Sequence, residues 1–153
     1  MVFFDLHCAD ILAQIFRLDY TFLVPDAVAE ELKSLKVERW QQLGLKVEEQ
    51  SGDQVSLVER LRQIYKEPST RDLFALVLAH NFGCSLVTRD GELGKAARNE
   101  GVKVRHTLEL IDELVPEGIL SPPDAADALE EICRKRKKFP QGESWRRIAK
   151  WRS

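Results

Sequence analysis

Residues 69–104 read STRDLFALVLAHNFGCSLVTRDGELGKAARNEGVKV. Ser69 and Asp72 form the pattern of a capping box, which predicts the start of a helix. Residues 73–79 are continuously apolar, and Gly83 supplies the stop. Because a helix that is apolar on all sides must be covered, we expect this one to be buried.

The rest of this stretch alternates between strand and helix patterns. It predicts a strand at residues 84–87, a helix at 91–99 that ends before Gly101, and another strand at 102–104. This βαβ order indicates a parallel sheet with helices on both faces and right-handed crossovers. The sequence therefore predicts an α/β fold.

Outside this stretch, the apolar pattern predicts further elements of both kinds. Strands are expected at residues 2–4, 21–24 and 45–49, and helices at 9–16, 26–35, 55–64, 108–114 and from Ser121 onward. Asp26 follows Pro25 and is expected to cap the helix that runs to about Leu35.

Length and composition indicate one domain with a buried core. The chain has 153 residues, of which 44% are hydrophobic, and no Pro, Gly or Ser-rich linker divides it. Charges interrupt every apolar run before it could span a bilayer, and residues 1–6 lack a secretory pattern. The three cysteines lack metal-site or disulfide spacing. We expect a cytoplasmic protein without a membrane partner.

The charge divides the chain into an acidic body, residues 1–133, and a basic tail, residues 134–153. The tail has nine Lys and Arg against Glu143, which gives +8, so the overall charge of −2 leaves −10 on the body. Trp145 and Trp151 among these charges suggest a segment that binds nucleic acid by charge and stacking. Apolar residues at helical spacing predict equally well a helix docked on an acidic surface.

Four acids occupy places where an expected strand ends or an expected helix begins: Asp5, Glu31, Asp72 and Asp90. Asp5 and Asp90 follow expected strands, and the carboxyl edge of a parallel sheet is where such folds bind ligands. Three of the four could instead be helix caps, and Glu31 could be an ordinary surface residue. Oxygen donors without His or Cys favour a hard divalent cation, Mg²⁺ or Mn²⁺.

Helical geometry favours a functional interpretation of two of these acids. Glu31 falls within the apolar stripe of its helix, whereas Glu30 points away from it. Asp72 shares a face with Ala75, Leu76 and Ala79. A carboxylate buried there would cost several kcal/mol without a partner, and a shared cation is one such partner.

Other chemistries find little support. His7, His80 and His106 lack zinc-site spacing, and the chain has neither a nucleophile elbow nor a phosphate-binding glycine loop.

The four acids in this order, with PDAVAEEL at residues 25–32 and the TRD turn at 88–90, give the chain a resemblance to a PIN domain. The match covers about residues 2–131. Residues 101–120 resemble a subgroup of prokaryotic PIN proteins described mainly as nucleic-acid-binding, relatives of the VapC-type toxin ribonucleases. The resemblance implies a three-layer α/β/α sandwich around a central, mainly parallel sheet.

The resemblance also implies an activity, namely metal-dependent hydrolysis of RNA phosphodiester bonds, with Asp5, Glu31, Asp72 and Asp90 at a Mg²⁺ or Mn²⁺ site. Asp5 and Asp90 would bind the cation directly, and Glu31 and Asp72 would hold its waters or a second ion. The family usually has Ser, Thr or Asn two residues after the first acid, where this chain has His7.

The resemblance suggests partners as well. RNA is the expected substrate, the protein could be the toxin of a toxin–antitoxin pair with an antitoxin protein as partner, and a homodimer is expected. The alternative is a non-catalytic nucleic-acid-binding or regulatory module with the same fold.

Overall fold

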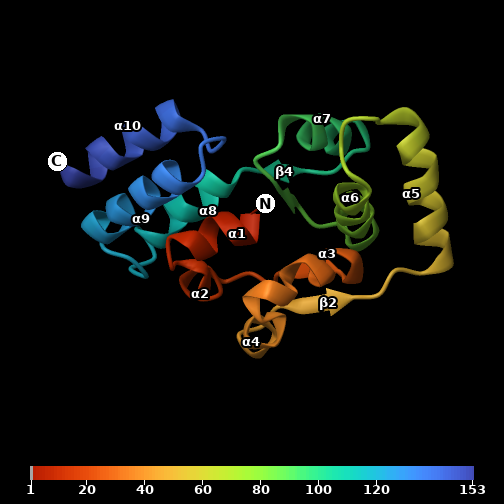
Figure 1. Cartoon of the computed structure of the whole chain (residues 1–153), viewed down its shortest axis with the longest axis horizontal. Coiled ribbons are helices and arrows are strands. Elements are labelled where there is room, and N and C mark those ends of the chain that lie inside the picture. Colours follow the sequence, from red (N-terminus) through yellow and green to blue (C-terminus); the bar gives the residue numbers. More distant parts are fainter. Residues whose placement is uncertain (1) are drawn as a thin grey trace. The chain divides into compact units, whose positions relative to one another are not determined.

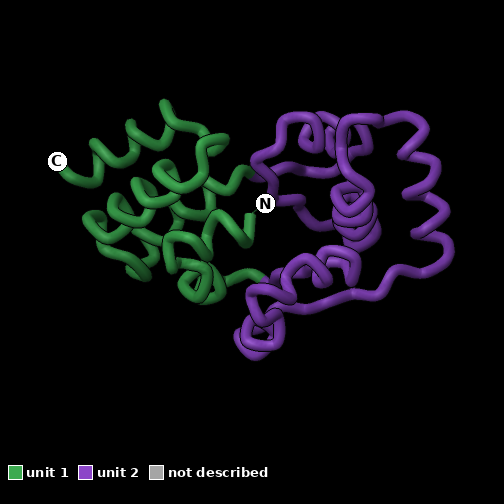
Figure 2. The backbone as a smooth tube through the Cα atoms, viewed as in Figure 1, with its two compact units in different colours: residues 1–20, 106–153 green, residues 21–105 purple. Residues whose placement is uncertain are grey.

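The computed structural model of the chain describes residues 2–153. They form two compact units, which Figure 2 shows in different colours. Unit 1 comprises residues 2–20 and 106–153, and unit 2 comprises residues 21–105. Unit 1 is therefore assembled from two segments that are distant in sequence, whereas unit 2 is one continuous segment. The division into a body and a tail at residue 133 stays a prediction.

Unit 1 is helical wherever its described residues have regular structure. Its helices are α1 (Val2–Cys8), α2 (Leu12–Ile15), α8 (Thr107–Leu114), α9 (Pro122–Lys135) and α10 (Gln141–Arg152). Helix α10 lies along α9, α1 also packs against α9, and α2 packs against α8 (Figure 1). Leu6, Leu12, Ile111, Leu129 and Ile148, all at most 2% exposed, are part of the core that these helices share.

Unit 2 is the α/β part of the chain. Its strands form two parallel pairs, β1 (Leu23–Pro25) with β2 (Lys46–Glu48) and β3 (Leu86–Val87) with β4 (Val104–Arg105). Its helices are α3 (Asp26–Glu31), the 3-10 helix η1 (Leu32–Leu35), α4 (Val37–Gln42), α5 (Gly52–Ile64), α6 (Thr70–Phe82) and α7 (Gly91–Asn99).

Helix α6 is the buried helix that the sequence predicts. Leu73, Leu76 and Val77 are at most 1% exposed, and they belong to one apolar cluster with residues of α5 and α7. Ser69 and Asp72 form the expected capping box, and Gly83 ends the helix in a left-handed conformation, with φ of 66°. Burial of an apolar helix face, more than helix propensity, thus stabilises this part of unit 2.

The prediction of a strand at residues 2–4 is wrong, because these residues belong to helix α1. Val2, Phe3 and Leu6 recur at helical spacing, so a helix can gather the same apolar groups as a strand would. The ring of Phe3 stacks on that of Phe16, with centroids 6.5 Å apart, and Leu6 is 1% exposed. Asp5 consequently lies within a helix and not at the end of a strand.

Other predictions differ from the structure in detail. Within residues 2–153, the strands form two separate two-stranded sheets, and the three-layer sandwich stays a prediction. Asp26 is the first residue of α3 and not its cap, since Pro25 occupies the capping position. The expected helix at 9–16 is limited to α2, and α4 was not expected. Among the described residues, no helix is both long and apolar enough to cross a lipid bilayer.

Candidate functional site

Asp5 is the only buried charged residue within residues 2–153, with an exposed fraction of 0%. Its Oδ1 accepts a hydrogen bond from Nε of Arg136 at 2.8 Å. Arg136 directly follows α9, against which α1 packs. Because a buried carboxylate without a partner would be strongly destabilising, this guanidinium accounts for how unit 1 tolerates the charge.

The Cys8 side chain is close to the backbone of Asp5. Its Sγ donates a hydrogen bond to the Asp5 carbonyl oxygen at 3.0 Å. Burial, and then the nearby negative charge of Asp5, raise the pKa of Cys8 above its ordinary 9.0. The neutral thiol is therefore favoured, which argues against Cys8 as a nucleophile.

Glu31 is the last residue of α3 and lies on the less exposed side of that helix. Its side chain is 23% exposed, against 59% for Glu30, as the helical pattern predicts. The Oε1 of Glu31 is 3.3 Å from Nη1 of Arg71. Since α3 packs against α6 and Arg71 directly precedes Asp72, this ion pair connects the helices that present two of the candidate acids.

Asp72 lies in the first turn of α6 and is half-buried. Its Oδ2 accepts a hydrogen bond from the backbone N–H of Ser69 at 3.1 Å, and Ser69 Oγ accepts one from the N–H of Asp72 at 3.1 Å. The capping box uses Oδ2 of Asp72, and Oδ1 takes no part in it. Asp72 therefore has a structural role and retains an oxygen that could bind a ligand.

Asp90 is exposed and caps α7, shortly after strand β3. Its Oδ1 accepts hydrogen bonds from the backbone N–H groups of Glu92 at 2.9 Å and Leu93 at 3.2 Å. The N–H of Asp90 donates to Oγ1 of Thr88, which is 8% exposed. A buried threonine thus holds the turn, and the helix dipole favours the charge at this position.

The four candidate acids are divided between the two units. Glu31, Asp72 and Asp90 belong to unit 2, and Asp5 belongs to unit 1. Across residues 2–153, no three His, Cys, Asp or Glu side chains are grouped so that they could hold a metal ion. The convergence of the four acids on one site therefore stays a prediction.

Sequence reasoning missed the arginine partners of two acids. Arg71 pairs with Glu31, and Arg136, which the sequence assigns to the basic tail, pairs with Asp5. An arginine carries no sequence signal for its partner, because its long side chain can reach acids on several neighbouring elements. Only the packing of α1 on α9 and of α3 on α6 brings these charges together.

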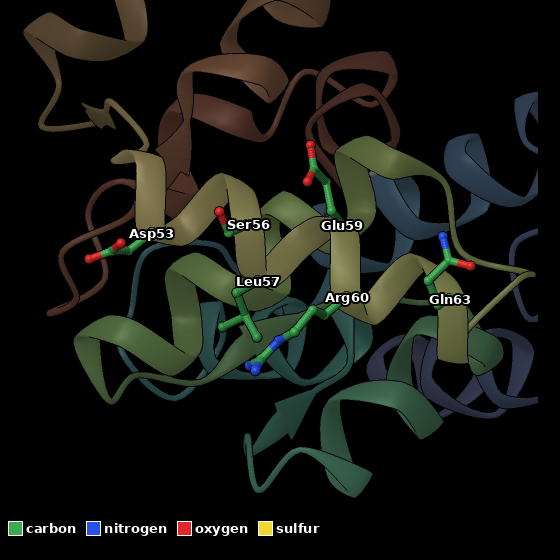
Figure 3. Close-up of a pocket in the computed structure, with 6 residues that line it drawn as sticks. All are labelled: Asp53, Ser56, Leu57, Glu59, Arg60 and Gln63. Atoms are coloured by element: carbon green, nitrogen blue, oxygen red, sulfur yellow. The ribbon is translucent and has the colours of Figure 1, made fainter.

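A pocket of about 580 Å³ lies along α5, lined by Asp53, Ser56, Leu57, Glu59, Arg60 and Gln63. Figure 3 shows Leu57 and Arg60 on one side of the helix and Glu59 pointing away from them. The lining includes none of the four candidate acids. We therefore regard the pocket as a feature of the α5 surface, separate from the candidate site.

Comparison with known families agrees with the resemblance to a PIN domain that the four acids and the two short motifs indicate. The family model described as a PIN domain matches residues 1–150, and the chain therefore belongs to the PIN-domain family. The chain has no significant match among curated proteins or solved structures. Family membership implies the α/β fold and a nuclease-type function.

Proposed function

We propose that this PIN-domain protein is a metal-dependent ribonuclease that hydrolyses RNA phosphodiester bonds. The observation that carries the proposal is the complete burial of Asp5, a charged group on a short helix. Burying a carboxylate is costly, and ionisable groups kept in such environments are concentrated at functional sites.

The chemistry of the candidate acids supports a divalent cation. Asp5, Glu31, Asp72 and Asp90 offer carboxylate oxygens alone, which suit Mg²⁺ or Mn²⁺ better than zinc. In this proposal Asp5 and Asp90 hold the cation, and Glu31 and Asp72 hold its waters or a second ion. A bound cation would supply Lewis acidity and a more acidic water.

Neighbouring groups of the chain hold two of these acids, Asp5 and Asp90, in fixed orientations. Arg136 orients the Asp5 carboxylate, since its Nε donates to Oδ1 at 2.8 Å. Thr88 and the first turn of α7 hold Asp90 in a single orientation. Carboxylates that are already oriented lose little entropy when they bind a ligand.

The proposal also extends to partners. We infer that RNA is the substrate, that the protein could act as the toxin of a toxin–antitoxin pair, and that it forms a homodimer. The alternative is a non-catalytic nucleic-acid-binding or regulatory module. One observation favours it: each acid already has a partner in the protein, an arginine for Asp5 and Glu31 and a helix cap for Asp72 and Asp90.

A cleavage assay on the full chain separates the two functions. We expect labelled single-stranded RNA to be cleaved with Mg²⁺ or Mn²⁺ and to stay intact in EDTA. Asp90→Asn should lower the rate by about 100-fold or more, because asparagine keeps the helix cap but removes the ligand charge. Asp5→Asn should have the same effect on rate.

Asp124→Asn is the matched control for these changes. Asp124 is an exposed acid in the first turn of α9, so its substitution alters the same charge without touching a candidate ligand. Circular dichroism and the melting temperature report whether each variant is folded. RNA binding without cleavage would favour the non-catalytic module. Cleavage that continues in EDTA and in both Asn variants would indicate a nuclease that does not depend on a metal ion.

A further inference from the structure

One side of α10 is docked against the rest of unit 1. Ser144 and Ile148 are at most 2% exposed. Arg147 donates two hydrogen bonds to Asp112 of α8, from Nε to Oδ1 at 2.7 Å and from Nη2 to Oδ2 at 2.9 Å. Arg152 donates to Asp127 and Glu130 of α9 at 2.9 and 2.8 Å. These contacts fix the rotation of α10 about its axis.

Next to this docked side, an exposed face of α10 combines an aromatic ring with two cations. The docked-helix interpretation of the sequence places Trp145 and Ala149 in the buried stripe, but Trp145 is 45% exposed and Ala149 is also exposed. Arg146 and Lys150 are exposed as well and form no ion pair with any residue that the structure describes. We call Trp145, Arg146, Ala149 and Lys150 the α10 outer face.

The spacing within the α10 outer face brings these groups together. Trp145 and Ala149 are one turn apart, as are Arg146 and Lys150, and the two pairs lie in adjacent rows. Around the helix axis Ala149 falls between Trp145 and Arg146, and its side chain is a single methyl group. A flat group could therefore cover the Trp145 ring while a negative charge next to it meets Arg146 and Lys150.

From this arrangement we propose that the α10 outer face binds single-stranded RNA, with a base stacked on Trp145 and the adjacent phosphates held by Arg146 and Lys150. Aromatic platforms beside basic side chains are how proteins bind unpaired strands without sequence preference. The charge distribution supports this occupant, since residues 134–153, which include α10, carry +8. This inference rests on the proposed function and adds a binding surface outside the candidate acids.

Helix α10 carries both an arginine in ion pairs and, among the residues that the structure describes, an arginine without one, and comparing them tests the inference. Arg146 and Arg152 carry the same charge on α10, but Arg152 is neutralised by Asp127 and Glu130. We expect Arg146→Gln to lower the slope of log affinity against log salt by about 0.7, the value for one phosphate contact on a single strand. Arg152→Gln should leave that slope unchanged.

The aromatic contact has its own variant and control. Trp145→Ala should weaken binding of labelled single-stranded RNA by about 5- to 100-fold, the effect of losing one stacked base. Phe82→Ala is the control. Phe82 lies in unit 2 and is 51% exposed, so this substitution removes a comparably exposed aromatic ring. Fluorescence anisotropy in EDTA measures binding in the absence of cleavage, and melting temperatures report folding.

Several outcomes would overturn the inference: unchanged binding by Trp145→Ala, equal weakening by Phe82→Ala, or no RNA binding by the wild-type chain. Loss of self-association in sedimentation experiments with Trp145→Ala, without loss of RNA binding, would assign the face to a second copy of the chain instead. Cleavage by the wild type with normal binding by Trp145→Ala would refute this inference alone. Weakened binding by Trp145→Ala in a chain that never cleaves RNA would support it and refute the nuclease.

Discussion

Arg136 Nε lies 2.8 Å from Oδ1 of Asp5, and the two side chains differ in exposure, at 35% for Arg136 and 0% for Asp5. Removal of the arginine therefore leaves a buried carboxylate without this partner, whereas removal of the acid leaves a cation that can reach water. We expect Arg136→Met to lower the free energy of unfolding by about 3–5 kcal/mol. Urea unfolding of the full chain measures the change.

Arg134→Met is the control for this prediction. Arg134 pairs with Glu131 but is 71% exposed, so its loss should cost at most about 1 kcal/mol. Asp5→Asn should fall between the two. Equal losses from Arg136→Met and Arg134→Met would show that the buried pair does not stabilise unit 1 as we describe.

The two capping boxes of unit 2 separate the structural from the functional role of Asp72. Gln54 closes the box of α5 with Ser51, as Asp72 closes that of α6 with Ser69. We expect Gln54→Ala and Asp72→Ala each to lower the free energy of unfolding by about 1 kcal/mol. If Asp72 is a ligand, only Asp72→Ala should also lower RNA cleavage, and equal cleavage by both variants would leave Asp72 as a cap alone.

Tyr65 makes unit 2 sensitive to alkaline pH. Its Oη donates to Oε2 of Glu100 at 2.6 Å, and this bond, followed by burial, raises the pKa of Tyr65 above its ordinary 10.0. Folding thus favours the neutral phenol, so the stabilisation is complete below the unfolded-state pKa and disappears as the pH rises through the folded-state pKa. Melting temperatures of the wild type should exceed those of Tyr65→Phe near neutral pH, and the difference should shrink above pH 10.0. A difference that does not change with pH would contradict this account.

The ion pair between α8 and α10 tests the docking of α10. Both hydrogen bonds of the Arg147–Asp112 pair join planar groups, and they raise the pKa of Arg147, so the guanidinium stays charged. Lysine keeps the charge but cannot form the two parallel bonds. We expect Arg147→Lys to lower the free energy of unfolding by about 1 kcal/mol, and exposed Arg146→Lys to leave it unchanged. Equal melting temperatures of Arg147→Lys and the wild type would argue against this docking contact.

Local signals predicted the fold best where a helix has both a cap and a stop. Ser69, Asp72 and Gly83 define α6, and α7 begins and ends where the sequence places it, at Gly91–Asn99. Residues 2–4 were misassigned because three consecutive apolar residues fit a buried strand and a buried helix equally well. Tertiary packing decides between the two.

The candidate site shows the same division between local and tertiary information. Helical periodicity distinguished Glu31 from Glu30, and the structure agrees, with 23% and 59% exposure. The partners of the acids depend on contacts between distant segments, and Arg136 is 131 residues from Asp5 along the chain. Whether a given acid meets an arginine or a metal ion is a property of packing, which no short motif specifies.

The division of unit 1 into two segments has a consequence for synthesis on the ribosome. Residues 2–20 emerge before unit 2, but α8 and α9, against which they pack, follow only after all of unit 2. At about 5–20 residues per second, this delay lasts several seconds. Leu6, Ile11, Leu12 and Ile15 stay exposed to water during that time, although the folded chain buries them. We therefore expect residues 2–20 to bind chaperones during synthesis and to be an aggregation-prone part of the unfinished chain.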